Sequence, residues 1–338
     1  MSHFGSPPWL VSCIALVAAT ALLLALTAAL REPMPGKRPA AAPTPGPSPS
    51  TVPAPATPST APGALTPLLP LRPALPAAQR ESLHAALEDY LAEVEGRLAI
   101  SVHDLSTGAT FTHNLSRRFI TGSLVKLNIL LVLLLQAQDE GRTLTEEERS
   151  LATRMIRYSD NNVTDVLYAR IGFGAGLSEG NERFGLSGTV PGQANVWGAT
   201  TTTASDQIRL LRAVFTEASP LSVDARRYVA QLLGSVAPEQ AWGVSVAAGG
   251  NGHAQLKNGW VPRDSDGGRW AINSAGHVRN GDHTYLIAVL SDHHLAYGDG
   301  VTCVEEVVAR VVHTLESAAE LSVPSGQGRA EAPWPGGS

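Results

Sequence analysis

The chain has 338 residues, a formal net charge of −5 and 16% charged residues, against roughly 25% in an average soluble domain. This length allows one large domain or two small ones. The mild acidity does not fit a nucleic-acid partner, which would need a basic surface. Of the two cysteines, Cys13 lies in an apolar N-terminal segment. Cys303 therefore has no partner in the globular part, and we expect it to be a small buried hydrophobic residue.

The first segment, residues 1–32, predicts a membrane anchor. No charged residue occurs from Trp9 to Leu30, which is long enough for a helix across the roughly 30 Å hydrocarbon core. We interpret it as an uncleaved anchor rather than a removed signal peptide, because it is long and no Lys or Arg precedes it. The basic residues Arg31, Lys37 and Arg38 follow it, and by charge alone they favour a cytoplasmic C-terminal part.

Residues 33–76 are rich in Pro, Ala, Thr and Ser, a composition typical of a semi-rigid, polyproline-like spacer. At about 3.1 Å per residue, such a spacer could hold a domain up to roughly 100 Å from a bilayer. We expect the folded domain at residues 77–324, followed by a disordered tail at 325–338.

The folded domain is predicted from apolar periodicity, turn residues and capping motifs. Its expected elements are helix 79–95, strands 98–105 and 109–112, helices 123–138, 145–157, 204–215 and 223–233, strands 255–257, 270–277 and 284–290, and helix 301–315. Strands from both ends of the domain that pair in one antiparallel sheet, with helices packed on it, predict an α+β fold in three α/β/α layers. The middle of the domain is an all-helical subdomain.

The motif Ser123-Leu124-Val125-Lys126 opens the most apolar of these helices. Residues three apart share a helix face, so the hydroxyl of Ser123 and the amine of Lys126 can meet. A serine nucleophile needs a base, and Lys126 can serve only when neutral. Burial and a neighbouring cation must then lower its pKa from about 10.4. Free N–H groups at the helix start would favour an oxyanion beside Ser123.

A second motif, Ser159-Asp160-Asn161, follows the helix 145–157. The hydroxyl of Ser159 can relay a proton to a departing amine. The amide of Asn161 can bind a substrate carbonyl and the side chain of Lys126. We expect Asp160 to bond to the backbone and to hold the shape of the loop.

A third motif, Lys257-Asn258-Gly259, lies at the end of a predicted strand. Lys257 supplies a cation for a substrate carboxylate, and Gly259 permits close approach of the backbone to a ligand. The N–H of Trp260, with that of Ser123, could form an oxyanion hole. Each motif alone also fits an ordinary helix cap, a surface lysine or a plain turn, so it is their joint order that favours a site.

In this order the three motifs resemble the signatures of class A β-lactamases and penicillin-binding proteins, over roughly residues 83–315. The resemblance implies a β-lactamase/transpeptidase-like fold and a serine acyl-enzyme, with no metal or organic cofactor. The residues that it implies are Ser123 as nucleophile, Lys126 as base, Ser159 as proton shuttle and, for substrate binding, Asn161, Lys257, Asn258, Gly259 and Trp260.

Two departures from the family pattern bear on function. The family usually has Thr or Ser where this chain has Asn258. Class A enzymes also carry a Glu after the Ser-Asp-Asn motif to activate the deacylating water, whereas residues 184–200 contain no Asp or Glu. Glu179 and Glu182 lie upstream on an expected helix and are alternative bases. We therefore expect acylation to occur and hydrolysis of the acyl-enzyme to be slow.

The expected function is that of a serine hydrolase acting on a β-lactam or on a D-Ala-terminated cell-wall peptide. The alternatives are a D-alanyl-D-alanine carboxypeptidase or transpeptidase, and a penicillin-binding sensor without turnover. This chemistry belongs outside the membrane, so we expect the extracytoplasmic face of the cell membrane, or secretion if the N-terminal segment is cleaved. We expect a monomer that contacts the membrane through its N-terminal helix.

Overall fold

The computed structural model describes residues 75–250 and 252–321. The predicted anchor, the predicted tail and all but the last two residues of the predicted spacer lie outside the described residues. The described helices and strands therefore belong to the domain expected at 77–324.

A five-stranded antiparallel sheet forms the centre of the domain, in the order β2-β1-β7-β6-β5. Its strands are β1 (Arg97–Asp104), β2 (Thr110–His113), β5 (His253–Arg263), β6 (Arg269–Asn280) and β7 (His283–His294). The first long strand, β1, pairs with the last, β7, along its whole length. The predicted sheet built from both ends of the domain is thereby confirmed, and β5 forms one edge of it.

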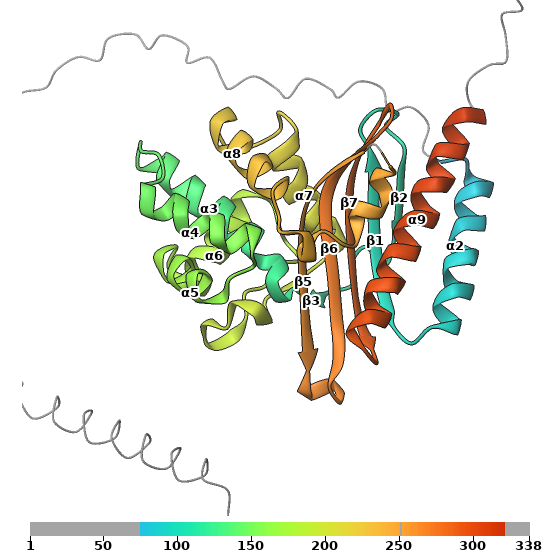
Figure 1. The fold of residues 1–338 in the computed structure, drawn as a ribbon, viewed down its shortest axis with the longest axis horizontal. Helices are drawn as coiled ribbons and strands as arrows, with labels where there is room; N and C mark the ends of the chain where they lie inside the picture. Colours follow the sequence, from blue (N-terminus) through green and yellow to red (C-terminus); the bar gives the residue numbers. More distant parts are fainter. Residues whose placement is uncertain (1–74, 251, 322–338) are drawn as a thin grey trace, which may run out of the picture. The chain divides into compact units, whose positions relative to one another are not determined.

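Two terminal helices, α2 (Ala77–Glu93) and α9 (Tyr297–Leu321), cover one face of this sheet (Figure 1). Their apolar side chains pack against the β-branched residues of the strands, which fit a half-buried pleated surface. The core of this layer includes Leu83, Leu87, Ile100, Val102, Ile287, Val289, Val304, Val307, Val308 and Val311.

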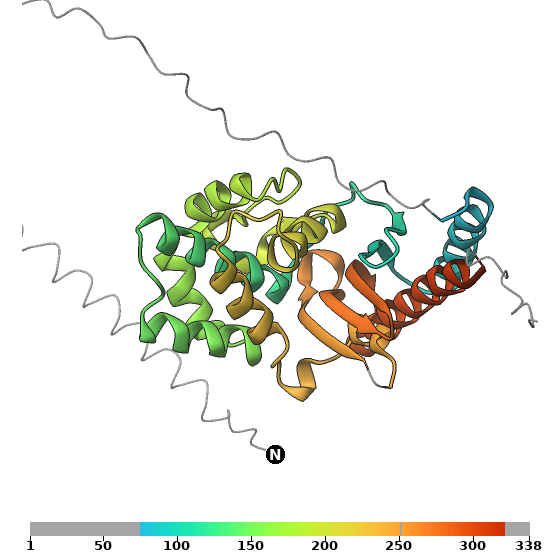
Figure 2. The same cartoon turned by 90° about the horizontal axis from the view of Figure 1, so that it is seen from above.

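The remaining helices lie on the other face, so the domain has three layers, as Figure 2 shows from above. They are α3 (Val125–Asp139), α4 (Glu146–Arg157), α5 (Asn161–Arg170), α6 (Phe173–Arg183), α7 (Ala204–Phe215) and α8 (Val223–Leu233). The buried sheet residues under this layer include the small side chains Ala99, Ala275 and Ala288. Small residues let α7 approach the sheet closely. The α+β fold with an all-helical region is as predicted.

Helix α3 lies inside the helical layer, and nearly every residue from Val125 to Ala137 is buried. A helix that is apolar on all sides is stable only when it is enclosed. Within the described residues one stretch, Gly122–Asp139, is long and apolar enough to cross a membrane, and 78% of it is buried inside the domain. Its burial identifies it as the core helix of the domain.

Most predicted elements agree closely with the observed ones. The bounds of α7 and α8 are those expected, and Thr145 and Glu148 form the predicted capping box of α4. Several elements differ, and β6, β7 and α9 are all longer than the expected 270–277, 284–290 and 301–315. Strand β5 extends well beyond residues 255–257, and α5 begins directly after the Ser159 turn, where no helix was expected.

His277, on β6, lies where helix α7 packs against the sheet. Its ring stacks on Phe215 of α7 with 4.2 Å between ring centroids, and its Nδ1 lies 2.9 Å from Oε1 of Gln255. Burial, then the charges of Arg279 and His253, lower the pKa of His277 to about 4. The folded state therefore holds this ring neutral, and the unfolded chain binds a proton first as the pH falls.

This predicts an acid-sensitive contribution to stability. The contribution of neutral His277 to the free energy of unfolding should be complete above pH about 6.5, the usual histidine pKa. It should be lost as the pH falls toward 4, because the unfolded chain gains a proton that the folded state does not. In urea unfolding, wild-type protein should lose about 1–2 kcal/mol more free energy of unfolding between pH 7 and 4.5 than His277→Asn. His313→Asn, at an exposed position of α9, is the control. An equal pH dependence in wild type and His277→Asn would contradict the prediction.

Candidate active site

Ser123 lies in a single 3-10 turn, Gly122–Leu124, that runs directly into α3. Leu124 and Val125 both have right-handed helical backbone angles, so the helical path is continuous from Ser123 to Lys126. Residues at this spacing lie on one face. Ser123 is half-buried, whereas Lys126 is fully buried. We call Gly122–Leu124 the Ser123 turn.

The edge strand β5 presses its backbone against the Ser123 turn. Gly122 has a φ of +50°, and a Cβ added to it would lie 2.8 Å from the carbonyl oxygen of Trp260 and 3.0 Å from its nitrogen. A Cβ added to Gly259 would lie 2.3 Å from the nitrogen of Leu124 and from the oxygen of Thr121. Both positions therefore require glycine, and the Trp260 N–H lies beside the start of the turn.

Asn273, on β6, ties the segment before the Ser123 turn to the sheet. Its fully buried side-chain Nδ2 donates to the carbonyl oxygens of Ile120, at 2.9 Å, and Thr121, at 3.2 Å. Its Oδ1 accepts from the backbone N–H of Ser291 at 3.3 Å. Sequence reasoning did not identify this residue, because its partners are about 150 residues away.

The amine of Lys126 is surrounded by the second motif. Its Nζ donates to the carbonyl oxygen of Ser159 at 2.5 Å and to Oδ1 of Asn161 at 2.7 Å, and it lies 3.1 Å from Oγ of Ser159. A neutral amine can donate the first two hydrogen bonds and accept one from the Ser159 hydroxyl through its lone pair. The arrangement thus suits both protonation states of Lys126.

The same hydroxyl also meets the third motif. Nζ of Lys257 lies 3.2 Å from Oγ of Ser159 and donates to the carbonyl oxygen of Asn258 at 2.7 Å. Lys257 is 1% exposed. The Ser159 hydroxyl therefore lies between two buried amines that come from α3 and β5.

The electrostatics favour loss of a proton from this pair. Burial lowers the pKa of Lys126 to about 8, while the carboxylates of Asp160 and Asp165 act in the opposite direction. Burial, and then the charge of Lys126, lower the pKa of Lys257 well below its usual value. Desolvation and like charge both penalise a second buried ammonium group.

The turn that carries Ser159 is held by its neighbour. Ser159 has a φ of +55°, in the left-handed region, which costs a non-glycine residue about 1 kcal/mol or more. Asp160 caps α5 by accepting from the N–H groups of Asn162 and Val163, and it pairs with Arg154 at 2.5 Å. Asp160 thus bonds to the backbone as expected, and the cap keeps the strained turn in place.

Trp197 is a further residue at this site that the sequence did not reveal. It lies in the segment that contains no acidic residue, and its ring centroid is 4.9 Å from Nζ of Lys126. Its Nε1 donates to Oδ1 of Asp165 at 2.7 Å. Glu179 and Glu182, the two alternative bases, are exposed residues of α6.

The structure does not bring Asn258 into this group. Side chains alternate along a strand, so Asn258 points away from Ser159. Its Nδ2 donates to the carbonyl oxygens of Gln240, at 2.8 Å, and Trp242, at 3.0 Å, and the residue is 1% exposed. In this structure its side chain holds the backbone of Gln240 and Trp242, and its contact with a substrate stays a prediction. The ring of Trp260 also lies on this side, 5.9 Å from that of Trp242, so only its backbone faces the Ser123 turn.

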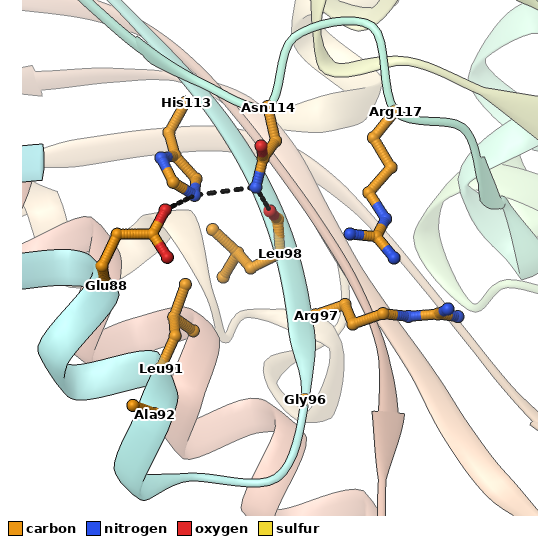
Figure 3. A pocket seen from close by; sticks show the side chains of 9 residues that line it. All are labelled: Glu88, Leu91, Ala92, Gly96, Arg97, Leu98, His113, Asn114 and Arg117. Carbon is orange, nitrogen blue, oxygen red and sulfur yellow. Dashed lines mark hydrogen bonds and ion pairs between the residues drawn. The ribbon is translucent and has the colours of Figure 1, made fainter.

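A cavity of about 240 Å³ lies elsewhere, between α2 and the edge of the sheet formed by β1 and β2 (Figure 3). His113 is held there between Glu88, at 3.4 Å, and Nδ2 of Asn114, at 2.7 Å. None of the predicted site residues lines this cavity. Among the described residues, no group of three or more His, Cys, Asp or Glu side chains is placed to hold a metal ion.

One known protein family has a model that matches this chain. The model of the β-lactamase enzyme family named Beta-lactamase2 matches residues 82–149 and 147–315. The chain belongs to this β-lactamase family. The matched residues include all three motifs and cover most of the described domain.

Solved structures share the fold of this family member at low sequence identity. The structure of PBP-A superposes with a TM-score of 0.63 and 18% identity, over 74% of this chain and all of PBP-A. A class A β-lactamase from Bacteroides cellulosilyticus gives 0.61 and 16%, over 71% of this chain and 99% of that one. The TLA-1 extended-spectrum β-lactamase gives 0.61 and 16%, over 70% and 99%.

A curated relative matches a shorter region. "Putative lipoprotein LppW" of Mycobacterium tuberculosis is 30% identical over 122 residues, and the protein of the same name in Mycobacterium bovis matches equally. The match covers 36% of this chain and 38% of the length of LppW. It relates parts of the two chains, not the whole proteins.

The contact between β5 and the Ser123 turn predicts a strong effect of a single methyl group. Gly259→Ala should displace the turn, lower the rate of covalent labelling by a fluorescent penicillin about 100-fold, and cost about 1–3 kcal/mol of stability. Gly298→Ala is the matched control, because a Cβ there meets nothing within 4 Å. Equal labelling rates and equal urea midpoints for the two variants would contradict this contact.

Proposed function

We propose that this chain is a serine acyl-transfer enzyme in which Ser123 is acylated by a β-lactam or by a D-Ala-terminated cell-wall peptide. The observation that supports this most is the position of the Ser159 hydroxyl between the buried amines of Lys126 and Lys257, with Ser123 one helical turn from the first amine. A surface lysine or an ordinary helix cap needs no such enclosure.

The proposed acylation begins with a neutral Lys126. Its amine takes the proton of Ser123 as Oγ attacks the substrate carbonyl carbon and the C–O bond forms. The proton then passes through the Ser159 hydroxyl to the substrate nitrogen, whose bond to the carbonyl carbon breaks. Such a relay balances the proton without a metal, and general acid–base catalysis of this kind contributes typically 10²–10⁴-fold.

The developing negative charge on the carbonyl oxygen is assigned to the N–H groups of Ser123 and Trp260. One donor of this kind typically contributes about 2.7–4 kcal/mol to the barrier. This assignment is supported by the close contact between β5 and the Ser123 turn, which glycine at positions 122 and 259 permits. The contact brings the Trp260 nitrogen beside the turn. Asn161, which is exposed, and Lys257 would bind the substrate amide and its carboxylate.

The proposed substrate class is inferred from the family and from a solved structure with a similar fold. A variant of PBP-A has been solved as an acyl-enzyme complex with penicillin G, and it superposes on this chain with a TM-score of 0.61. We extend that chemistry to Ser123. The likeness to LppW, named as a lipoprotein, supports an extracytoplasmic location, and residues 1–32 are proposed as the membrane anchor.

Slow deacylation is the second part of the proposal. Residues 184–200 supply no carboxylate, and a tryptophan ring lies against the amine of Lys126 instead. The same observation favours a second candidate function, a penicillin-binding sensor that is acylated and does not turn over. A D-alanyl-D-alanine carboxypeptidase or transpeptidase needs the acyl group to be released, and assays on stem peptide and on a chromogenic cephalosporin separate these functions.

Intact-mass spectrometry tests the acyl-enzyme directly. Wild-type protein treated with penicillin G should gain the mass of one ring-opened penicillin, and the adduct should persist after excess penicillin is removed. Ser123→Ala should gain nothing, whereas the control Ser116→Ala, at an exposed position, should react like wild type. Rapid penicillin hydrolysis without an adduct would refute slow deacylation, and the absence of both would refute the proposed function.

The pH dependence of acylation tests the role of Lys126. Only the neutral amine is a base, so the acylation rate should rise about tenfold per pH unit at low pH and level off above the pKa of about 8. Lys126→Met should lose this dependence together with most of the rate. A wild-type profile without a group that titrates near pH 8 would argue against Lys126 as the base.

A further inference from the structure

We propose that Trp197 is a positioning residue that covers the amine of Lys126 and excludes water from the space between Lys126 and Ser123. This inference deepens the proposed function and in part rests on it. It assigns the long life of the acyl-enzyme to the indole ring as well as to the absence of a carboxylate.

The geometry places the indole where water would otherwise approach. The hydrogen-bond partners of Nζ of Lys126 belong to the turn 159–161. The ring of Trp197 comes from a separate segment and lies 4.9 Å from the same nitrogen. With three polar contacts and a ring face around it, the amine is fully buried, although Trp197 itself is only half-buried.

The ring is fixed at two places. Its Nε1 donates to Asp165 on α5, and its apolar body packs against the core of the helical layer. A bond at one end and packing along the body leave the indole little freedom to swing away. Val196, the residue before it, is 55% exposed and has no such role, so it offers a matched control.

An indole face suits this position for a chemical reason. It attracts a cation and accommodates a neutral amine, but it offers a water molecule no strong hydrogen bond. Two carboxylates, Asp160 and Asp165, favour the Lys126 cation. The nearby amine of Lys257 has its own pKa lowered by the charge of Lys126. Loss of the ring would let water solvate the cation, and the pKa of Lys126 should then rise toward its usual value.

Hydrolysis of the acyl-enzyme needs the space that the ring occupies. A water oxygen must bond to the acyl carbon while its proton passes to a base, and the bond from that carbon to Oγ of Ser123 must break as Oγ regains a proton. In the proposed function that base is Lys126, which lies one helical turn from Ser123. With Trp197 over the amine, water cannot reach both the amine and the ester.

The pKa of Lys126 can be measured directly and without an activity assay. It contains three lysines, Lys37, Lys126 and Lys257, so protein labelled with ¹³C at lysine Cε gives three signals in NMR spectra. Lys37→Arg and Lys257→Arg assign them. In full-length wild type the Lys126 signal should titrate near pH 8, and in Trp197→Ala the midpoint should rise by about one pH unit.

Trp197→Phe keeps a ring face but loses the bond from Nε1 to Asp165, so its midpoint should lie between those of wild type and Trp197→Ala, and Val196→Ala should match wild type. Trp197→Leu should be intermediate, and it decides the question if the alanine variant does not fold. An unchanged Lys126 midpoint in a folded Trp197→Ala or Trp197→Leu protein would overturn the inference.

The second readout is the lifetime of the penicillin adduct. In Trp197→Ala it should shorten at least about tenfold, in Trp197→Phe it should shorten less, and Val196→Ala should keep the wild-type lifetime. An equal lifetime in all four proteins would also overturn the inference. If wild type forms no adduct, the proposed function fails, and the NMR titration still decides whether Trp197 covers Lys126.

Discussion

Two buried ammonium groups beside one hydroxyl repel each other, so each makes it harder for the other to keep its proton. Lys126 and Lys257 lie within 3.1 and 3.2 Å of the same oxygen, that of Ser159. Like charges in a low-dielectric interior repel strongly, and burial denies each the hydration that would stabilise it. The site resolves this conflict by lowering the affinity of the amines for protons, which is what a lysine base requires. The sheet, the helical layer and the turn that joins them hold the two amines in this relation.

Much of the fold follows from local pattern. Helices α7 and α8 have the bounds that were predicted, and in the structure Thr203 and Ser222 cap them. Strand β5 was predicted too short, since Asn258, Gly259 and Pro262 have low β propensity. Its length is imposed by pairing with β6 from His253 to Arg263. Helix α5 was missed because its first turn carries two asparagines rather than an apolar periodicity.

The site was predictable where its residues are close in sequence and not where they meet across the fold. The three motifs predicted Ser123, Lys126, Ser159 and Lys257, and the last three meet in the structure. Asn258 lies outside this group because a strand turns alternate side chains to opposite faces. Asn273 and Trp197 left no signal of their own. One signal was available in the composition. Arginine supplies nearly all basic residues, and both lysines of the described domain belong to the motifs.

The burial of α3 has a consequence for any lipid bilayer that the unfolded chain meets. Gly122–Asp139 is as long and apolar as a spanning helix, so before the domain closes around it, lateral partition into lipid competes with folding. Lys126 and Asn128 interrupt that apolar run near its start, where a lysine costs less insertion free energy than the roughly 2.5–3.5 kcal/mol at the centre of a spanning helix. The amine of Lys126, the proposed base, therefore also weakens the partition of this segment into lipid.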